Sequence, residues 1–394
     1  QYRRTVGLMH RWRMDLFTAN NQWAVRPADE RFWTVAEARI AAQGYQATAR
    51  EKGVPCSDLR VEAHGADVAL VGKAGVPARF TYSAFGQIAA RVGAPASYLR
   101  QLPATLACQN LNHGLRHNVD QNAVAQLLLH TNGDYVLRAV TSERYDRIWN
   151  GDFLAPLCNL ESKGWKAPPA YSTGKGPTRD ATASDASLSL SIKEGDTISP
   201  AGVYVSDKDA FVFLVDQERQ VRSGSGALLR GIIASNNEIG TGSLYLSAML
   251  FDGVCGNHII WGVQSMREFK IRHTGEANAR FAQTLVEFKE QIIEQGAAEQ
   301  ERTIVKARTM LLGASRIEAF ENLLALVAKK RIQVPQKALN AALDTAEQNP
   351  RYGDPRSVWA FVNGLTEVSQ RSDYADERVG LDKAAGRILE EVVF

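Results

Sequence analysis

Polar side chains suited to ligand binding gather at the ends of two apolar runs in the second half of the chain. Residues 228–234 form the first run and lead into the amides Asn236 and Asn237, and a second run leads to Asn257. Amide and cationic side chains are typical partners of phosphates and other anions. We interpret this stretch, which reaches to Gly275, as a recognition surface, and the three asparagines as a candidate polar pocket.

Cationic residues follow these amides, and two of them are two residues apart in the sequence. In an extended strand, Lys270 and Arg272 lie two residues apart on one face, so their side chains project together about 7 Å apart. His273 comes next, and Glu268 alone opposes the charge of Arg267, Lys270 and Arg272. The segment is therefore locally positive and suits a phosphate backbone.

A second cationic group follows a predicted β-hairpin. Apolar runs at 123–130 and 135–140 flank an Asn-Gly pair, which is the strongest short-range signal of a hairpin. A tyrosine among arginines suits a phosphate backbone with stackable bases. The alternative is a solvated surface with ion pairs, because three acidic residues balance the arginines. The group consists of Arg138, Arg144, Tyr145 and Arg147.

Recognised catalytic and metal-binding motifs are absent from the sequence. His113 and His117 have the i, i+4 spacing of a metal-binding helix, but the Glu of a metalloprotease is missing between them and Gly114 weakens the helix. No serine lies in a G-x-S-x-G elbow, and no glycine-rich stretch fits a phosphate-binding loop. We predict no catalytic residue, no metal and no cofactor, and take the two histidines as surface or packing residues.

The composition is that of a weakly basic globular protein. Of 394 residues, 45% are hydrophobic, and 46 Lys and Arg oppose 43 Asp and Glu. This balance excludes a polycation but not a local basic face. No apolar run approaches the roughly 20 residues that span a bilayer, and residues 1–12 lack the apolar core of a signal peptide. We expect a cytoplasmic protein without a membrane partner.

The periodicity predicts an α+β fold in three parts. Residues 1–33 form an N-terminal arm rich in Trp and Arg, 34–275 an α+β core domain with mixed or antiparallel strands, and 276–394 a helical C-terminal region. Within the core we expect a mobile loop near 172–187, a hairpin over 59–71, and helices at 34–53, 83–92 and 104–117. A further helix is expected after Thr141-Ser142, carrying Tyr145, Ile148, Trp149 and Leu154.

Several short blocks follow one another along the sequence: Phe80-Thr81-Tyr82 through Pro95-Ala96-Ser97-Tyr98-Leu99, and residues 137–145, 235–240, 254–257, 271–274 and 358–367. In this order they resemble the phage- and plasmid-related proteins of domain-of-unknown-function family 932. One departure is plain, because the family more usually shows Asn-Ser-His-Asp-Gly where this chain has Asn236-Asn237-Glu238-Ile239-Gly240. The resemblance implies a mobile-element gene product, often encoded beside recombination and replication functions. It brings no established activity, cofactor or catalytic residue.

The leading hypothesis is a non-enzymatic protein of the host-cell cytoplasm that binds single-stranded nucleic acid in annealing, recombination or replication, and that assembles into homo-oligomers. One alternative is a protein interaction factor that acts against host defence through residues 1–33. Another is an enzyme on a small anionic ligand, with Asn236, Asn237, Asn257, Arg272 and His273 lining one pocket. The predicted nucleic-acid-binding residues are Arg138, Arg144, Tyr145, Arg147, Lys270, Arg272 and His273.

Overall fold

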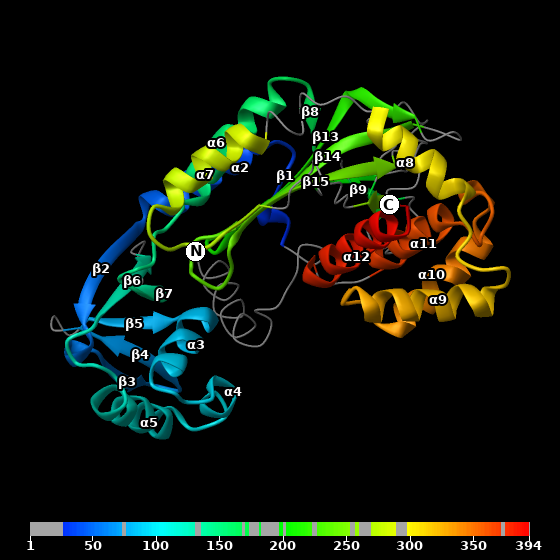
Figure 1. The fold of residues 1–394 in the computed structure, drawn as a ribbon. Helices are drawn as coiled ribbons and strands as arrows, with labels where there is room; N and C mark the ends of the chain where they lie inside the picture. The colour runs from blue at the N-terminus through cyan, green and yellow to red at the C-terminus, as the bar shows by residue number, and fades with distance from the viewer. Residues whose placement is uncertain are drawn as a thin grey trace.

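The computed structural model is an α+β protein built on two large sheets, which confirms the predicted fold class (Figure 1). A small third sheet joins three short strands, β9 (Ala170–Ser172), β10 (Ala181–Thr182) and β11 (Thr197–Ser199). Most of the predicted loop at 172–187 lies outside the described residues. The structure describes residues 27–72, 76–130, 135–167, 170–172, 181–182, 197–199, 202–222, 227–252, 257–259, 269–288, 298–371 and 375–393.

The first sheet and its helices form what we call the N-terminal unit, residues 49–142. Its strand order is β2-β6-β7-β5-β4-β3, and the β5–β7 pair alone is parallel among the pairs described. The helices share a buried core with the strands that includes Ile88, Leu111 and Leu137. The elements are β2 (Ala49–Pro55), β3 (Arg60–His64), β4 (Asp67–Val71), β5 (Pro77–Phe80), α3 (Tyr82–Arg91), α4 (Ala96–Leu99), α5 (Ala104–His117), β6 (Val124–His130) and β7 (Val136–Ser142).

Both predicted hairpins are present in the N-terminal unit. Strands β3 and β4 pair around Gly65, whose φ of 66° suits a tight turn, and β6 pairs with β7. The helices predicted at 83–92 and 104–117 are confirmed as α3 and α5. The helix expected at 34–53 begins with the predicted cap at Thr34, but it ends at Ala47 because residues 49–55 pair with β6 instead.

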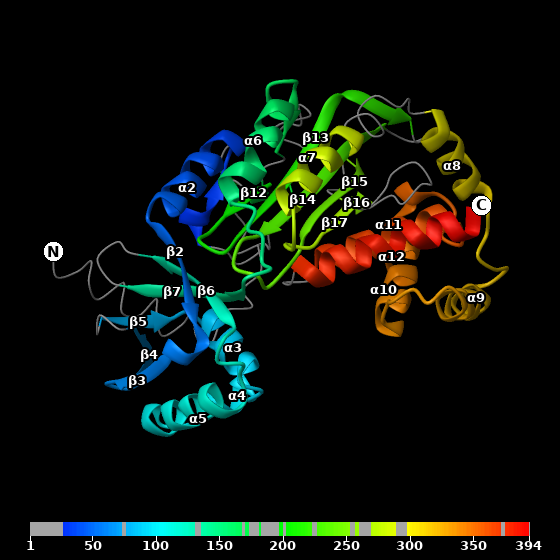
Figure 2. The same ribbon diagram turned by 60° about the vertical axis from the view of Figure 1, so that its left-hand side comes forward.

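The second sheet has the order β1-β12-β13-β14-β15-β16, with β17 paired to β15 and β8 paired to β13. Helices α2 and α7 lie beside α6 against this sheet (Figure 2). The described strands and helices are β1 (Arg31–Phe32), α2 (Val35–Ala47), α6 (Asn150–Glu161), β8 (Trp165–Lys166), β12 (Val203–Val205), β13 (Asp209–Arg222), β14 (Ala227–Asn237), β15 (Leu244–Asp252), β16 (Asn257–Ile259) and β17 (Phe269–Ile271).

From residue 277 onward the described chain is helical, as predicted. Helix α7 buries Phe281 and Phe288 on one stripe, and α8, α11 and α12 join the core of the second sheet. The predicted core domain at 34–275 therefore contains two sheets with separate cores, and the C-terminal helices belong to the second. Their bounds are α7 (Ala277–Phe288), α8 (Ala298–Thr309), α9 (Arg316–Lys329), α10 (Gln336–Gln348), α11 (Val358–Gln370) and α12 (Ala375–Val393).

The helix predicted after Ser142 begins later than expected, so that Leu154 lies in it but Tyr145, Ile148 and Trp149 do not. Residues 143–149, which we call the connector, are not helical, and α6 begins only at Asn150. Tyr145 instead forms a bridge with Thr274, and the Asp146 amide donates to the carbonyl oxygen of His273 at 3.0 Å. Residues 143–144 form a turn, and no helix follows it at once because a segment about 130 residues away pairs with Tyr145 and Asp146.

None of the helices in the described ranges combines the length and the apolar character that a bilayer crossing requires.

Candidate functional site at the junction of the two sheets

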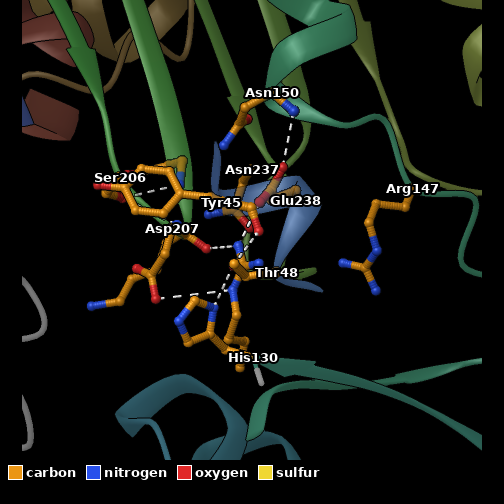
Figure 3. Close-up of polar contacts among 12 residues, drawn as sticks. Tyr45, Thr48, His130, Arg147, Asn150, Ser206, Asp207, Asn237 and Glu238 are labelled. Carbon is orange, nitrogen blue, oxygen red and sulfur yellow. Dashed lines mark hydrogen bonds and ion pairs between the residues drawn. The ribbon is translucent and has the colours of Figure 1, made fainter. Parts of the chain in front are cut away.

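Several of the residues singled out in the sequence lie where the N-terminal unit meets the second sheet. Figure 3 shows part of this region, including the hydrogen bond between Asn150 and Glu238. Four segments meet there: the end of β7 with the connector, the end of β14 with the following turn, the β12–β13 turn, and the β17–α7 turn. We call this region the junction. Its interior is polar, and its candidate ligand-binding side chains are mostly buried.

Arg138 enters the junction because of a β-bulge. Leu128 pairs with Ala139 and Leu129 with Leu137, so Arg138 is the extra residue of β7. A bulge of this kind redirects a side chain and bends the strand. The Arg138 side chain is 1% exposed, and its Nη2 donates to the Asp207 carbonyl oxygen and to Glu238 Oε1, the latter at 2.5 Å.

Glu238 is the counter-charge of Arg138 and was not a candidate from the sequence. Its second carboxylate oxygen accepts a hydrogen bond from the Asn150 amide at 2.9 Å, at the first turn of α6. Burial raises the pKa of the Glu238 carboxyl, and the adjacent Arg138 opposes this shift. Both oxygens are therefore engaged, and the pair joins the N-terminal unit to the second sheet. The one feature of the sequence that could have indicated Glu238 is its position directly after β14.

Tyr145, His273 and Arg147 form an aromatic and cationic stack beside this ion pair. The rings of Tyr145 and His273 stack with centroids 5.2 Å apart, and the Tyr145 hydroxyl donates to the Asn237 carbonyl oxygen at 3.0 Å. The Arg147 guanidinium lies 5.1 Å from the Tyr145 ring, and its Nε donates to Glu51 Oε1 at 2.6 Å.

The protonation states in this stack follow from burial. Burial lowers the pKa of His273 to about 4 and raises the pKa of Tyr145. Both rings are therefore neutral at pH 7, and His273 carries no charge with which to bind a phosphate. Arg138, Arg147 and His273 are buried, so the structure does not offer these three at the surface.

The predicted polar pocket does not form. Asn236 is buried, and its Nδ2 donates to the Ile148 carbonyl oxygen and to Asn150 Oδ1, both at 2.8 Å. Asn237 instead accepts from the amide of Thr241. On β15, Tyr245 pairs with Ser235, the neighbour of Asn236, whereas Asp252 pairs with Asn257. Tyr245 and Asp252 are seven residues apart, which is about 23 Å along a strand at 3.3 Å per residue. The residues proposed to line one anion pocket are therefore separated.

Three of the predicted residues, Arg144, Lys270 and Arg272, are exposed. Arg280 on α7 is exposed as well, and its Nη2 donates to the carbonyl oxygens of Arg272, at 2.9 Å, and of Thr274. We call Arg144, Lys270, Arg272 and Arg280 the cationic surface. Two exposed carboxylates, Glu143 and Glu276, lie on the same segments.

The sequence missed Asp146 as the residue that fixes this arrangement. One carboxylate oxygen of Asp146 accepts from the Ala277 amide at 2.5 Å, the first residue of α7, and the other accepts from Asn278 Nδ2 at 3.3 Å. A carboxylate at a helix N-terminus satisfies free amides and the helix dipole. Asp146 therefore holds the connector, and Arg144 with it, beside the β17–α7 turn.

Within the described ranges, no three His, Cys, Asp or Glu side chains converge as metal ligands would. The buried carboxylate of the junction, Glu238, is held by Arg138 and the Asn150 amide. The arrangement is suited to joining two sheets and to fixing the cations at their border.

Comparison with known proteins yields one family. The model of a family described as a domain of unknown function (DUF932) matches residues 186–385, slightly more than half of the chain. No curated protein and no solved structure matches. The matched region contains Glu238 and His273, whereas Arg138 and the N-terminal unit precede it. The buried ion pair therefore joins the matched region to the unit before it.

Proposed function

The chain belongs to the DUF932 family, and we propose that it binds single-stranded nucleic acid at the cationic surface without catalysing a reaction. One observation carries the proposal: the connector, the β17–α7 turn and α7, each of which bears exposed cations, are held together by contacts of the junction. Arginine and lysine side chains bind phosphates irrespective of sequence. Roles in phage or plasmid recombination or replication, and assembly into homo-oligomers, belong to the proposal through the family resemblance.

The arrangement favours a single strand over a duplex. Two of the exposed cations, Lys270 and Arg272, lie in and directly after the short strand β17, and a third, Arg144, lies in a turn. Helix α7 contributes Arg280 alone to the cationic surface, and the Arg280 guanidinium is bonded to two backbone carbonyls, so α7 does not offer a row of cations to a major groove. A flexible strand adapts its phosphates to such a short line of charges more readily than a stiff duplex does.

The proposal is tested by fluorescence anisotropy with labelled oligo-dT and oligo-U across a range of salt concentrations. We expect micromolar binding that weakens with salt, and a triple variant, R144Q/K270Q/R272Q, that binds more weakly. Because each contacted phosphate of a single strand contributes about 0.7 to the slope of log K against log salt, losing three contacts lowers that slope by about 2. Arg280 is left intact because it also donates to two backbone carbonyls.

A matched control removes the same charge elsewhere. Arg116, Lys329 and Lys337 are exposed on α5, α9 and α10, and R116Q/K329Q/K337Q should bind as the wild type does. The proposal fails if no salt-dependent binding occurs at micromolar protein, or if both triple variants lose binding equally. The second result would mean that net charge, not this surface, attracts the strand.

A further inference from the structure

We propose that His113 and His117 form a chelating site for a divalent transition-metal ion that prefers imidazole, namely Cu²⁺, Ni²⁺ or Zn²⁺. The two residues lie one turn apart at the C-terminal end of α5, and the centroids of their rings are 4.6 Å apart. Both side chains are exposed, and among the described residues neither ring makes a hydrogen bond or an ion pair to the protein. The site is independent of the junction and of the cationic surface.

The helix that carries the pair is well fixed, contrary to the weakening expected from Gly114. Gly114 is buried where α5 crosses the end of α3, and an added Cβ would lie 2.5 Å from the Cβ of Val92. The glycine therefore permits close packing of the two helices. Helix α5 continues through His117, and the Asn118 amide closes its last turn on the Gly114 carbonyl oxygen at 2.8 Å.

The separation of the two rings is short enough for both to bind one ion. Metal–nitrogen bonds to histidine are about 2.0–2.1 Å long, so two bonds at a tetrahedral angle place the nitrogens about 3.3 Å apart. Rings with centroids 4.6 Å apart and planes inclined by 44° reach this spacing when they turn a nitrogen toward a common point. Because the face is exposed, water can complete the coordination.

The chemistry of the donors selects the class of ion. Imidazole suits copper, nickel and zinc, whereas magnesium and calcium require oxygen ligands, which this pair does not supply. The last turn of a helix carries the negative end of its dipole, which favours a bound cation. Arg116, next to His117, is the neighbouring charge that opposes binding.

Holding two ligands on one rigid turn makes the second bond intramolecular, which strengthens binding about a hundredfold over a single histidine. We would titrate the full chain, without an affinity tag, with CuCl₂, NiCl₂ and ZnCl₂ separately by isothermal calorimetry. We expect one ion per chain, and affinity about a hundredfold weaker in His113→Gln and in His117→Gln. His64→Gln, which changes an exposed histidine on β3, is the control and should bind as the wild type does.

Thermal unfolding without metal checks that the two glutamine variants fold as the wild type does, as expected for exposed positions. The proposal is overturned if the wild type binds none of the three ions, or if both variants retain wild-type affinity. Oligonucleotide binding should be unchanged in His113→Gln and His117→Gln, so failure of this site and failure of the cationic surface are separate results.

Discussion

Arg138→Met removes the cation from the buried pair at the junction while keeping a long side chain in its place. In the wild type, Arg138 donates to Glu238 and to the Asp207 carbonyl oxygen, and both hydrogen bonds are lost in the variant. Glu238, itself 2% exposed, then keeps the Asn150 amide as its remaining partner in the described structure. Removing one member of a buried ion pair costs about 3–5 kcal/mol, and we expect a loss of that size at neutral pH.

A second substitution tests whether the unbalanced carboxylate causes this loss. In R138M/E238Q the buried negative charge is gone, and glutamine can still accept from the Asn150 amide. We expect the double variant to be more stable than Arg138→Met alone, because a neutral side chain is easier to bury than an unpaired carboxylate. If the two substitutions acted independently, the second would add to the damage of the first.

The direction in which pH changes the stability of these variants follows from the pKa of Glu238. Burial gives Glu238 a folded-state pKa above its unfolded value, so its protonation stabilises the fold on the acid side and this stabilisation is lost as the pH rises. Without Arg138 the carboxyl takes up a proton more readily. The stability difference between wild type and Arg138→Met should therefore shrink as the pH falls.

Urea unfolding measures the stability of each variant, and amide exchange at Asn150 reports on the junction itself, since that amide donates to Glu238. The matched control is Arg60→Met, because Arg60 pairs with Glu62 at 3.1 Å on the surface, and both side chains are exposed. Surface pairs contribute about 0–1 kcal/mol, so the control should lose little. Equal losses in Arg138→Met and Arg60→Met, or no recovery in the double variant, would refute the reasoning.

Three further predictions concern single side chains, each checked by urea unfolding. Gly240→Ala should lower the free energy of unfolding more than Gly65→Ala does. Both glycines have positive φ, which destabilises alanine there by about 1–2 kcal/mol, but a Cβ at Gly240 would also lie 2.9 Å from the Thr141 side chain of β7, whereas a Cβ at Gly65 would meet no atom within 4 Å. Gly114→Ala should destabilise by about 1–3 kcal/mol through overpacking, whereas Gly44→Ala, with open space on α2, should stabilise by about 0.5–1 kcal/mol. His273 has a folded-state pKa of about 4, below the usual 6.5, so between these pH values the unfolded chain binds a proton that the folded chain does not. Acidification from pH 6.5 to 4 should therefore lower the free energy of unfolding by about 3 kcal/mol in the wild type, and by less in His273→Phe.

Local features of the fold could be predicted from the sequence because neighbouring residues determine them. Thr34 accepts from the amide of Glu37, as a helix cap should, and the Glu37 carboxylate accepts from the Thr34 amide in return. The alternating runs at 59–71 fold back on each other as expected. The class of the fold and the change to helices after residue 276 follow from the same periodicities.

The candidate site could be predicted only in part, because distant residues decide the burial of its members. Strict alternation along β7 gives no reason to bury Arg138, and the bulge that does so depends on how β6 pairs. The partner, Glu238, is 100 residues away. Tyr145 follows a plausible helix start, yet it forms a bridge to Thr274 instead of joining a helix. The sequence predicts which residues gather at the junction, but not which of them face solvent.

The buried pair and the cationic surface have separable roles, because no residue belongs to both. Arg138 and Glu238 form a buried ion pair with each other, whereas Arg144, Lys270 and Arg272 are exposed. The pair holds β7, and the connector continues from β7 toward Arg144. A weakened pair should therefore loosen the position of Arg144 without removing a single surface charge. Oligonucleotide affinity in Arg138→Met should then fall while the net charge of the cationic surface is unchanged, an outcome that simple electrostatic attraction does not predict.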